Sequence, residues 1–183
     1  MLEKPGGERI TTASLAARLG VSEAALYRHF ASKAQMFEGL IDFIEQTVFS
    51  LAKQLLEREA VSDPAPGSLG LRQARRLMQL LIQFAEKNPG MARVMCGDAL
   101  VVEHERLQQR MNQFFDRLES SWRQCLRPLA EARASSTPTV DAQVQAAALT
   151  ALAQGRLLRY VRSGFRRSPS EHLEATLDLL LAA

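Results

Sequence analysis

Hydrophobic residues recur at helical spacing along most of this chain, and no sustained alternation of apolar and polar residues indicates a β-strand. The clearest repeat spans residues 103–132, where an apolar side chain returns every three or four positions. Its members are Leu107, Met111, Phe114, Leu118, Trp122, Cys125 and Leu129. Such a stripe is typical of a helix that turns one face towards a core. The pattern therefore predicts an all-α protein.

The same spacing predicts further helices, separated by short breaks rich in proline, glycine or serine. One begins at a capping box formed by Ser32 and Gln35 and runs to about residue 58. Others are expected at residues 71–87, 91–100, 141–163 and 170–181, with loops at 61–70 and 134–140. The break after residue 87 follows from Pro89, because proline disfavours helical backbone at the preceding residue.

Residues 11–33, TTASLAARLGVSEAALYRHFASK, have the pattern of a helix-turn-helix. The first helix would bury Leu15, Ala16 and Leu19 and end at Gly20, which readily adopts left-handed backbone. Ser22 would cap the second helix. Its inward residues would be Ala25, Leu26 and Phe30, and its outward residues Glu23, Ala24, Tyr27, Arg28 and His29. A short exposed helix of this kind suits a DNA major groove, although similar helix pairs occur in proteins that never bind DNA.

The last two predicted helices are informative about assembly. The first carries a face of small or apolar residues, namely Val144, Ala147, Ala148, Ala151, Leu152 and Gly155. The second, HLEATLDLLLAA, is rich in leucine. This pair could complete the core of one subunit or join a second copy in a four-helix bundle. We favour a homodimer, because a single helix-turn-helix that contacts only one half of a DNA site binds weakly.

Composition is that of an ordinary globular protein, with 46% hydrophobic and 23% charged residues. No apolar run is long enough to cross a bilayer, and the start MLEKPGGE lacks the apolar core of a secretory signal, so no membrane partner is expected. Cys96 and Cys125 lie in apolar helical patterns, which indicates buried thiols in a cytoplasmic protein. The net charge of +3 permits contact with phosphates without requiring it.

Catalytic and metal-binding patterns are not apparent. His29, His104 and His172 lie in three different segments, away from either cysteine, so no metal site and no cofactor are predicted. No serine or cysteine nucleophile has an identifiable base, which argues against an enzyme. A basic run near the C-terminus contains Arg156, Arg159, Arg162, Arg166 and Arg167. This run could lie on a surface exposed to solvent or in an interface. Alternatively, it could form a second contact with nucleic acid.

Four segments carry a resemblance to a known family. They are residues 10–45, which include the helix-turn-helix, 84–100 (FAEKNPGMARVMCGDAL), 105–119 (ERLQQRMNQFFDRLE) and 156–165 (RLLRYVRSGF). In this order they resemble the TetR family of bacterial DNA-binding regulators, and within it the nucleoid occlusion factors. The resemblance implies a TetR-like fold, with a DNA-binding head at residues 1–34. The larger body, residues 35–183, would carry the C-terminal two-helix dimerisation element.

The resemblance also implies a function. Nucleoid occlusion factors bind short palindromic double-stranded DNA as homodimers and bind the C-terminal tail of the division protein FtsZ. They antagonise FtsZ polymers, so that septa do not form over unsegregated DNA. The chain is therefore expected to be cytoplasmic and nucleoid-associated.

The family's DNA-contacting pattern falls on nine residues of this sequence. They are Thr11, Thr12, Ser22, Glu23, Ala24, Ala25, Tyr27, His29 and Lys33. Hydroxyls and backbone N–H groups at a helix start can hold a phosphate, and small alanines allow close approach to base edges. Tyr27 and His29 could alternatively pack at the helix end.

A second set of residues is implied for the FtsZ tail. Phe43 points about 100° away from the apolar stripe centred near Phe37, Ile44 and Leu51, so it either packs against a neighbouring helix or opens onto a groove. In the resembling family this groove lies between the helix of Phe43 and the helix that ends at Asn-Pro-Gly. The residues expected around the tail are Phe43, Leu80, Phe84 and Lys87.

Two further expectations concern the head and the body. TetR heads normally start with an additional helix, and MLEKPGG looks like its end, so the head is expected to be truncated, loosened and weaker in operator binding.

The alternative function is a ligand-responsive TetR repressor whose body pocket is lined by Met78, Met91, Met95, Met111 and Trp122. A helical interaction module without a role at DNA is the third possibility.

Overall fold

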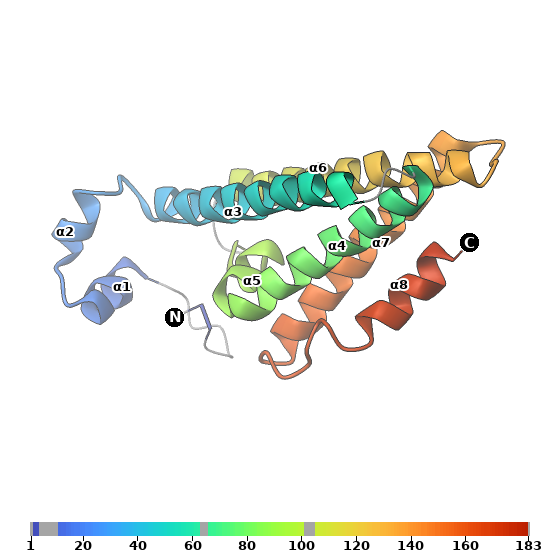
Figure 1. Ribbon diagram of the computed structural model, residues 1–183. Helices are drawn as coiled ribbons and strands as arrows, with labels where there is room; N and C mark the ends of the chain where they lie inside the picture. Colours follow the sequence, from blue (N-terminus) through green and yellow to red (C-terminus); the bar gives the residue numbers. More distant parts are fainter. Residues whose placement is uncertain (1, 4–10, 63–65, 101–104, 183) are drawn as a thin grey trace.

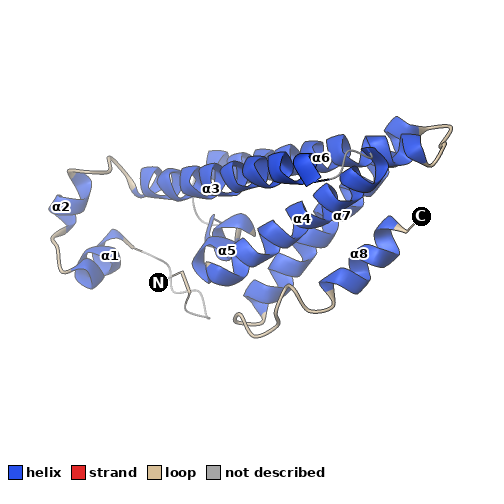
Figure 2. Cartoon of the chain, in the orientation of Figure 1, coloured by secondary structure: helices blue, strands red, loops and turns tan. Residues whose placement is uncertain are grey.

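The computed structural model describes residues 2–3, 11–62, 66–100 and 105–182. Over these ranges all regular structure is helical, which confirms the all-α prediction (Figure 2). The elements are α1 (Thr12–Leu19), α2 (Glu23–Tyr27), α3 (Lys33–Ser62), α4 (Pro66–Lys87), α5 (Pro89–Met95), the 3₁₀ helix η1 (Asp98–Leu100), α6 (Glu105–Ala132), α7 (Pro138–Arg162) and α8 (Leu173–Leu181). None of these helices is both long and apolar enough to span a bilayer.

The two short helices α1 and α2 lie at one end of α3, and the other helices form a bundle along its remaining length (Figure 1). Helix α6 runs beside α3 and packs against α4 and α7. Helix α8 returns along α7 and is tied to α4 by ion pairs from Arg75 to Glu174 and Asp178. One continuous helix, α3, therefore connects the head to the bundle.

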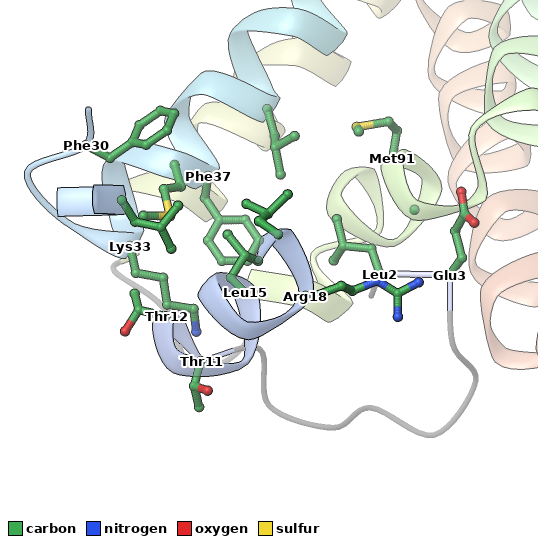
Figure 3. A pocket seen from close by; sticks show the side chains of 15 residues that line it. Leu2, Glu3, Thr11, Thr12, Leu15, Arg18, Phe30, Lys33, Phe37 and Met91 are labelled. Carbon is green, nitrogen blue, oxygen red and sulfur yellow. The ribbon is translucent and has the colours of Figure 1, made fainter. Parts of the chain in front are cut away.

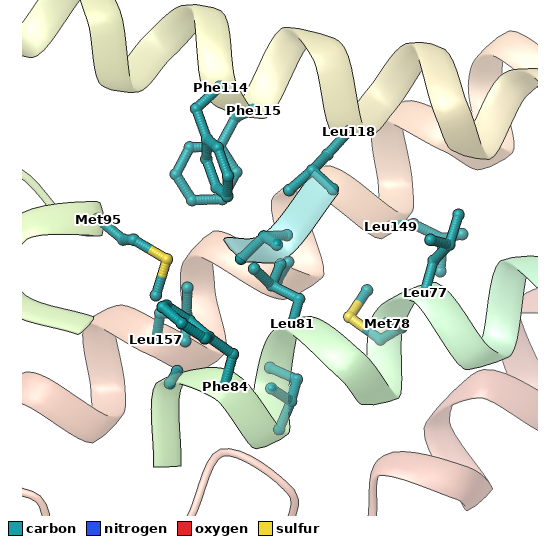
Figure 4. Close-up of a cluster of buried hydrophobic side chains, with 14 of the residues drawn as sticks. Leu77, Met78, Leu81, Phe84, Met95, Phe114, Phe115, Leu118, Leu149 and Leu157 are labelled. Atoms are coloured by element: carbon teal, nitrogen blue, oxygen red, sulfur yellow. The ribbon is translucent and has the colours of Figure 1, made fainter. Parts of the chain in front are cut away.

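The core lies where α4, α6 and α7 meet (Figure 4). Leu77, Leu81, Phe114 and Leu149 from these three helices are completely or almost completely buried. Trp122 is also buried, and its indole Nε1 donates a hydrogen bond to the carbonyl oxygen of Ala74 at 3.1 Å. The stripe from Leu107 to Leu129 thus faces the core as expected, although residues 103 and 104 of the predicted helix lie outside the described ranges.

The loop predicted at residues 61–70 is wrong at both ends. Helix α3 continues to Ser62 and α4 begins at Pro66, while residues 63–65 lie outside the described ranges. The glycines that suggested a loop are needed for close helix packing. A Cβ atom at Gly70 would lie 2.1 Å from the carbonyl oxygen of Cys125, and one at Gly67 would lie 2.7 Å from the Cβ of Ala132.

Other boundaries differ from the prediction by a few residues. Helices α5 and α7 each begin at a proline, Pro89 and Pro138, because the first helical turn needs no backbone N–H from that residue. The segment expected as one helix at residues 91–100 is broken at Gly97, which has a φ of 75°. Helix α8 begins at Leu173 instead of residue 170, after His172 in left-handed backbone.

Candidate DNA-binding head and partner groove

The head is organised by helix caps at both of its helices. The Thr11 hydroxyl accepts a hydrogen bond from the Ser14 N–H, and the Ser14 hydroxyl accepts one from the Thr11 N–H, each at 3.1 Å. Gly20 ends α1 in left-handed backbone with a φ of 68°. The Ser22 hydroxyl then accepts from the Ala25 N–H at 3.2 Å and starts α2. The predicted helices, stop and cap of the helix-turn-helix are therefore confirmed.

The structure exposes most of the residues implied to contact DNA. Thr11, Ser22, Glu23, Ala24, Tyr27 and His29 are exposed, whereas Thr12, Ala25 and Lys33 are half-buried. Three of them meet in one cluster, in which the Thr12 hydroxyl donates to Glu23 Oε2 at 2.8 Å and accepts from the Tyr27 hydroxyl at 3.4 Å. The capping hydroxyls of Thr11 and Ser22 accept backbone hydrogen bonds, but a hydroxyl that accepts can still donate its proton to a phosphate.

The inward side of the head is less covered than the sequence suggested. Leu26 is buried, but Phe30 is 37% and Leu19 61% exposed. Both line a cavity of about 640 Å³ between the head and the bundle, together with Leu15, Phe37 and Met91 (Figure 3). Burial of Phe30 and Leu19 was predicted wrongly because α3 and α5 cover only part of the apolar face of the head.

The groove implied for a partner lies between α3 and α4 and has a volume of about 450 Å³. All four residues expected there line it. Phe43 is 49% exposed, Leu80 is half-buried, Phe84 is only 7% exposed, and Lys87 is exposed. Phe43 therefore opens onto a groove and is not covered by a neighbouring helix. Phe84 forms part of the floor.

Two cations of α4 line the groove, Arg76 and Lys87, and no carboxylate among the described side chains does. They are eleven positions apart, which corresponds to about 16 Å along a helix. Arg76 lies 3.6 Å from Glu59, whereas Lys87 has no ion-pair partner in the described part of the chain. The groove combines exposed apolar side chains with positive charge at two separated positions.

Several groove residues were missed by sequence reasoning. Leu51 was placed in the buried stripe of its helix, but it is 43% exposed and lines the groove with Thr47 and Leu55. Arg76 and Gln79 of α4 also line it. Thr47 and Leu51 lie four and eight residues after Phe43, so helical spacing from Phe43 would have been the signal for them.

Exposed apolar side chains lie on α7 and α8. Val140, Val144 and Leu179 are 58%, 63% and 81% exposed. Ala147, Ala148 and Ala151 of α7 are exposed as well. We call the set Val140, Val144, Ala147, Ala148, Ala151 and Leu179 the C-terminal apolar face. It contains four of the six residues whose small or apolar side chains pointed to a helix-packing surface.

The residues suggested for a small-molecule pocket are not gathered in one place. Met78 and Trp122 are fully buried in the core, and Met91 lines the cavity beside the head. Only Met95 and Met111 share a cavity, of about 450 Å³, with polar side chains such as Gln108 and Gln154. The five residues expected to line one ligand pocket of a sensor therefore lie in three separate environments.

The two cysteines are free thiols, and burial raises the pKa of each to about 12. Across the described ranges no group of three or more His, Cys, Asp or Glu side chains is arranged to hold a metal ion.

Comparison with known proteins agrees with this architecture. Residues 1–40 match the family described as bacterial regulatory proteins, tetR family, and residues 70–183 match the tetracyclin repressor-like C-terminal domain of SlmA-like proteins. The nucleoid occlusion factor SlmA of Idiomarina loihiensis is 49% identical over 180 residues, covering 98% of this chain and 87% of that protein. That of Colwellia psychrerythraea is 45% identical over 182 residues, covering 100% of this chain and 87% of that protein.

A solved structure shows the same fold. The transcriptional regulator FadR from Bacillus subtilis, determined in complex with stearoyl-CoA, superposes with a TM-score of 0.69 over 94% of this chain and 88% of its own. At 12% sequence identity this likeness concerns the fold alone. The TetR-like fold predicted from the sequence is confirmed.

Proposed function

We propose that this chain, which belongs to the TetR family and within it to the SlmA nucleoid occlusion factors, binds palindromic DNA as a homodimer and holds the C-terminal tail of FtsZ. The family consists of DNA-binding, non-enzymatic regulators that are typically dimers. Binding to FtsZ would couple the division machinery to the DNA on which the protein sits. The protein would antagonise FtsZ assembly over the nucleoid.

The observation that carries the FtsZ proposal is the groove between α3 and α4. Phe43 and Leu51 are large apolar side chains left exposed on α3, and Leu80 faces the same space from α4. Lys87 and Arg76 add positive charge, and the described lining contains no carboxylate. Apolar anchors beside cations suit a short peptide segment that carries both hydrophobic and acidic residues.

The DNA proposal rests on the exposed surface of the head. Small residues at the start of α2, Ala24 and Ala25, let the helix approach base edges closely. Glu23 can accept a hydrogen bond from a cytosine amino group, and Thr12 holds its carboxylate in place. Tyr27, His29 and Lys33 would contact phosphates and fix the register of the helix on the duplex.

Binding of an FtsZ C-terminal tail peptide to the full chain, followed by fluorescence anisotropy, tests the groove. Phe43→Ala removes an exposed apolar anchor, and Lys87→Glu reverses the charge at one end. We expect either change to lower the affinity for the peptide by at least about tenfold, since the loss of an apolar anchor or of a charge-assisted contact costs about 1.5–3 kcal/mol of binding free energy.

The matched control is Lys53→Glu, a charge reversal on the same helix at a side chain that is 78% exposed and does not line the groove. It should leave peptide affinity unchanged. Sedimentation should show that all three variants keep the oligomeric state of the parent. Equal peptide affinity in the parent, Phe43→Ala and Lys87→Glu proteins would exclude this groove as the FtsZ site.

A further inference from the structure

The basic run near the C-terminus is divided by the fold into separate environments. Arg156, Arg159 and Arg167 line one cavity of about 380 Å³, at the turn from α7 into α8. Arg162 lines a different cavity. Arg166 donates from its Nε to the carbonyl oxygen of Ser163 at 2.9 Å. Three of the five arginines are thus gathered around one hollow, which lies outside both the head and the α3–α4 groove.

Arg156 is fixed at the base of this cavity by neutral groups. Its Nη1 donates to the carbonyl oxygens of Pro169 and Glu171, at 2.9 and 2.7 Å, and its Nη2 donates to the Thr176 hydroxyl at 2.8 Å. Its Nε is buried and has no hydrogen-bond partner. Burial, and the nearby charge of Arg159, lower the pKa of Arg156. The loop orients the guanidinium, which feels the charge of Glu171 but forms no ion pair with a carboxylate among the described residues.

The acidic groups of the surrounding elements each have partners of their own. Glu174, in the first turn of α8, is held by Arg75 and Gln79 of α4. Glu86 of α4 accepts hydrogen bonds from the hydroxyls of Ser168 and Ser170. Glu171 is the one carboxylate among the lining residues, and its Oε1 lies 3.9 Å from His172 Nε2. Among the described residues, three arginines therefore face one lining carboxylate, Glu171, and a second carboxylate, Glu86, is bound to the lining hydroxyl of Ser168.

We propose that this cavity binds a phosphate group. Guanidinium groups bind phosphate oxygens through paired N–H donors, and a fixed arginine loses little freedom when it does so. Arg159 and Arg167 supply two exposed guanidinium groups, which have no ion pair within the described residues. Ser168 and Thr176 line the same space, but their hydroxyl protons are donated to Glu86 and to the carbonyl oxygen of His172, so the arginines are the donors of this site. A bound dianion would also relieve the repulsion between Arg156 and Arg159.

The phosphate could belong to a small phosphorylated molecule or to the backbone of DNA held by the head. Both present the same tetrahedral oxygens to the arginines. They differ in one measurable respect, because only a backbone contact contributes to DNA affinity and to its dependence on salt.

Titration of the full chain with inorganic phosphate, by calorimetry at constant ionic strength with chloride as the competing anion, tests the site. The variant is Arg159→Gln/Arg167→Gln, which removes two exposed charges and leaves Arg156 in place. We expect phosphate affinity to fall by at least about tenfold, the loss of one or more charge-assisted hydrogen bonds. The matched control is Arg58→Gln/Arg127→Gln, which makes the same charge change at exposed positions on α3 and α6.

A DNA titration over a range of salt concentrations then identifies the source of the phosphate. Unchanged DNA binding in the cavity variant assigns the site to free phosphorylated molecules. Weaker DNA binding with a smaller salt slope, absent from the control, assigns it to the DNA backbone. No heat with phosphate in the parent protein, or equal phosphate affinity in the parent and the cavity variant, would overturn the proposal. None of these readouts depends on FtsZ binding.

Discussion

Gly70 shows how one residue type sets the distance between two helices. It lies in the first turns of α4, where this helix crosses the C-terminal half of α6. A Cβ atom at this position would lie 2.1 Å from the carbonyl oxygen of Cys125, which is backbone and cannot move aside alone. The absence of a side chain is therefore required for the crossing.

We expect Gly70→Ala to lower the free energy of unfolding by about 3 kcal/mol, because overpacking at a helix crossing forces backbone to shift. Urea denaturation measures this change. The control is Gly39→Ala in α3, where an added Cβ meets nothing within 4 Å. There alanine should stabilise the protein by up to about 1 kcal/mol through its higher helix propensity. Equal effects of the two substitutions would contradict this explanation of Gly70.

The roles of some single residues could be predicted from the sequence, and those of others could not. The caps Thr11 and Ser22 and the stop Gly20 were predictable, because each acts through its own backbone and near neighbours. The exposure of Leu51 was missed, because its spacing from Phe43 fits the groove while its spacing from Ile44 fits the buried stripe, and only the position of α4 decides between them. Interactions between neighbouring residues could be predicted from the sequence, whereas distances between helices could not.

At the scale of helices, α8 is attached to the bundle by both apolar and polar contacts. Leu173, Leu177 and Leu181 are buried on one face. On its flank, Glu174 accepts hydrogen bonds from Gln79 at 2.6 Å and from Arg75 at 2.8 Å. Because Gln79 also lines the α3–α4 groove, this contact joins the groove wall to the C-terminal helix.

The hydrogen bonds from Gln79 and Arg75 lower the pKa of Glu174 below its ordinary value of 4.5. A lowered pKa in the folded state stabilises the protein above the unfolded pKa, and this contribution is lost as pH falls through the folded pKa. We expect Glu174→Gln to lower the free energy of unfolding near neutral pH and to make it less dependent on pH below 4.5.

Urea denaturation at about pH 6 and about pH 3 measures both effects. The control is Glu57→Gln, which alters an exposed i, i+4 pair with Lys53, an arrangement that contributes little to stability. Its pH dependence should stay close to that of the parent. If Glu174→Gln and the parent lose the same free energy on acidification, the contact between α8 and α4 does not depend on the charge of Glu174.

Helix boundaries were harder to predict than helix identity, and the reason is physical. The segment at residues 61–70 contains proline, serine and glycine, which favour turns locally. Packing of Gly67 and Gly70 against α6 outweighs that preference and extends α4 to Pro66. The tertiary contact that decides this boundary lies more than fifty residues further along the chain.

At the scale of the whole molecule, α3 connects the two sites proposed to bind DNA and FtsZ. Its first turns meet the head, and its middle carries Phe43 and Leu51 of the groove. Arg110 of α6 holds it through ion pairs to Asp42 at 2.8 Å and Glu45 at 2.9 Å. The groove wall is therefore fixed to the core of the bundle by the same helix that leads to the head.

The C-terminal apolar face would complete this arrangement by joining two copies. Val144 and Leu179 leave large apolar areas in water in a single chain, and the exposed alanines of α7 allow close approach of a second pair of helices. A twofold pair through α7 and α8 would present two heads to the two halves of a palindrome.

We expect Val144→Glu/Leu179→Glu to raise the dimer dissociation constant by at least about a hundredfold, because buried unpaired carboxylates cost several kcal/mol. Sedimentation equilibrium measures dissociation, and affinity for a full palindrome should fall towards that for one half-site. The control is Leu51→Glu, the same kind of change at an exposed leucine in the groove, which should remain dimeric. An unchanged dimer in the double variant would mean that the copies associate through another surface, and the two heads would then have to be placed on DNA by a different symmetry axis.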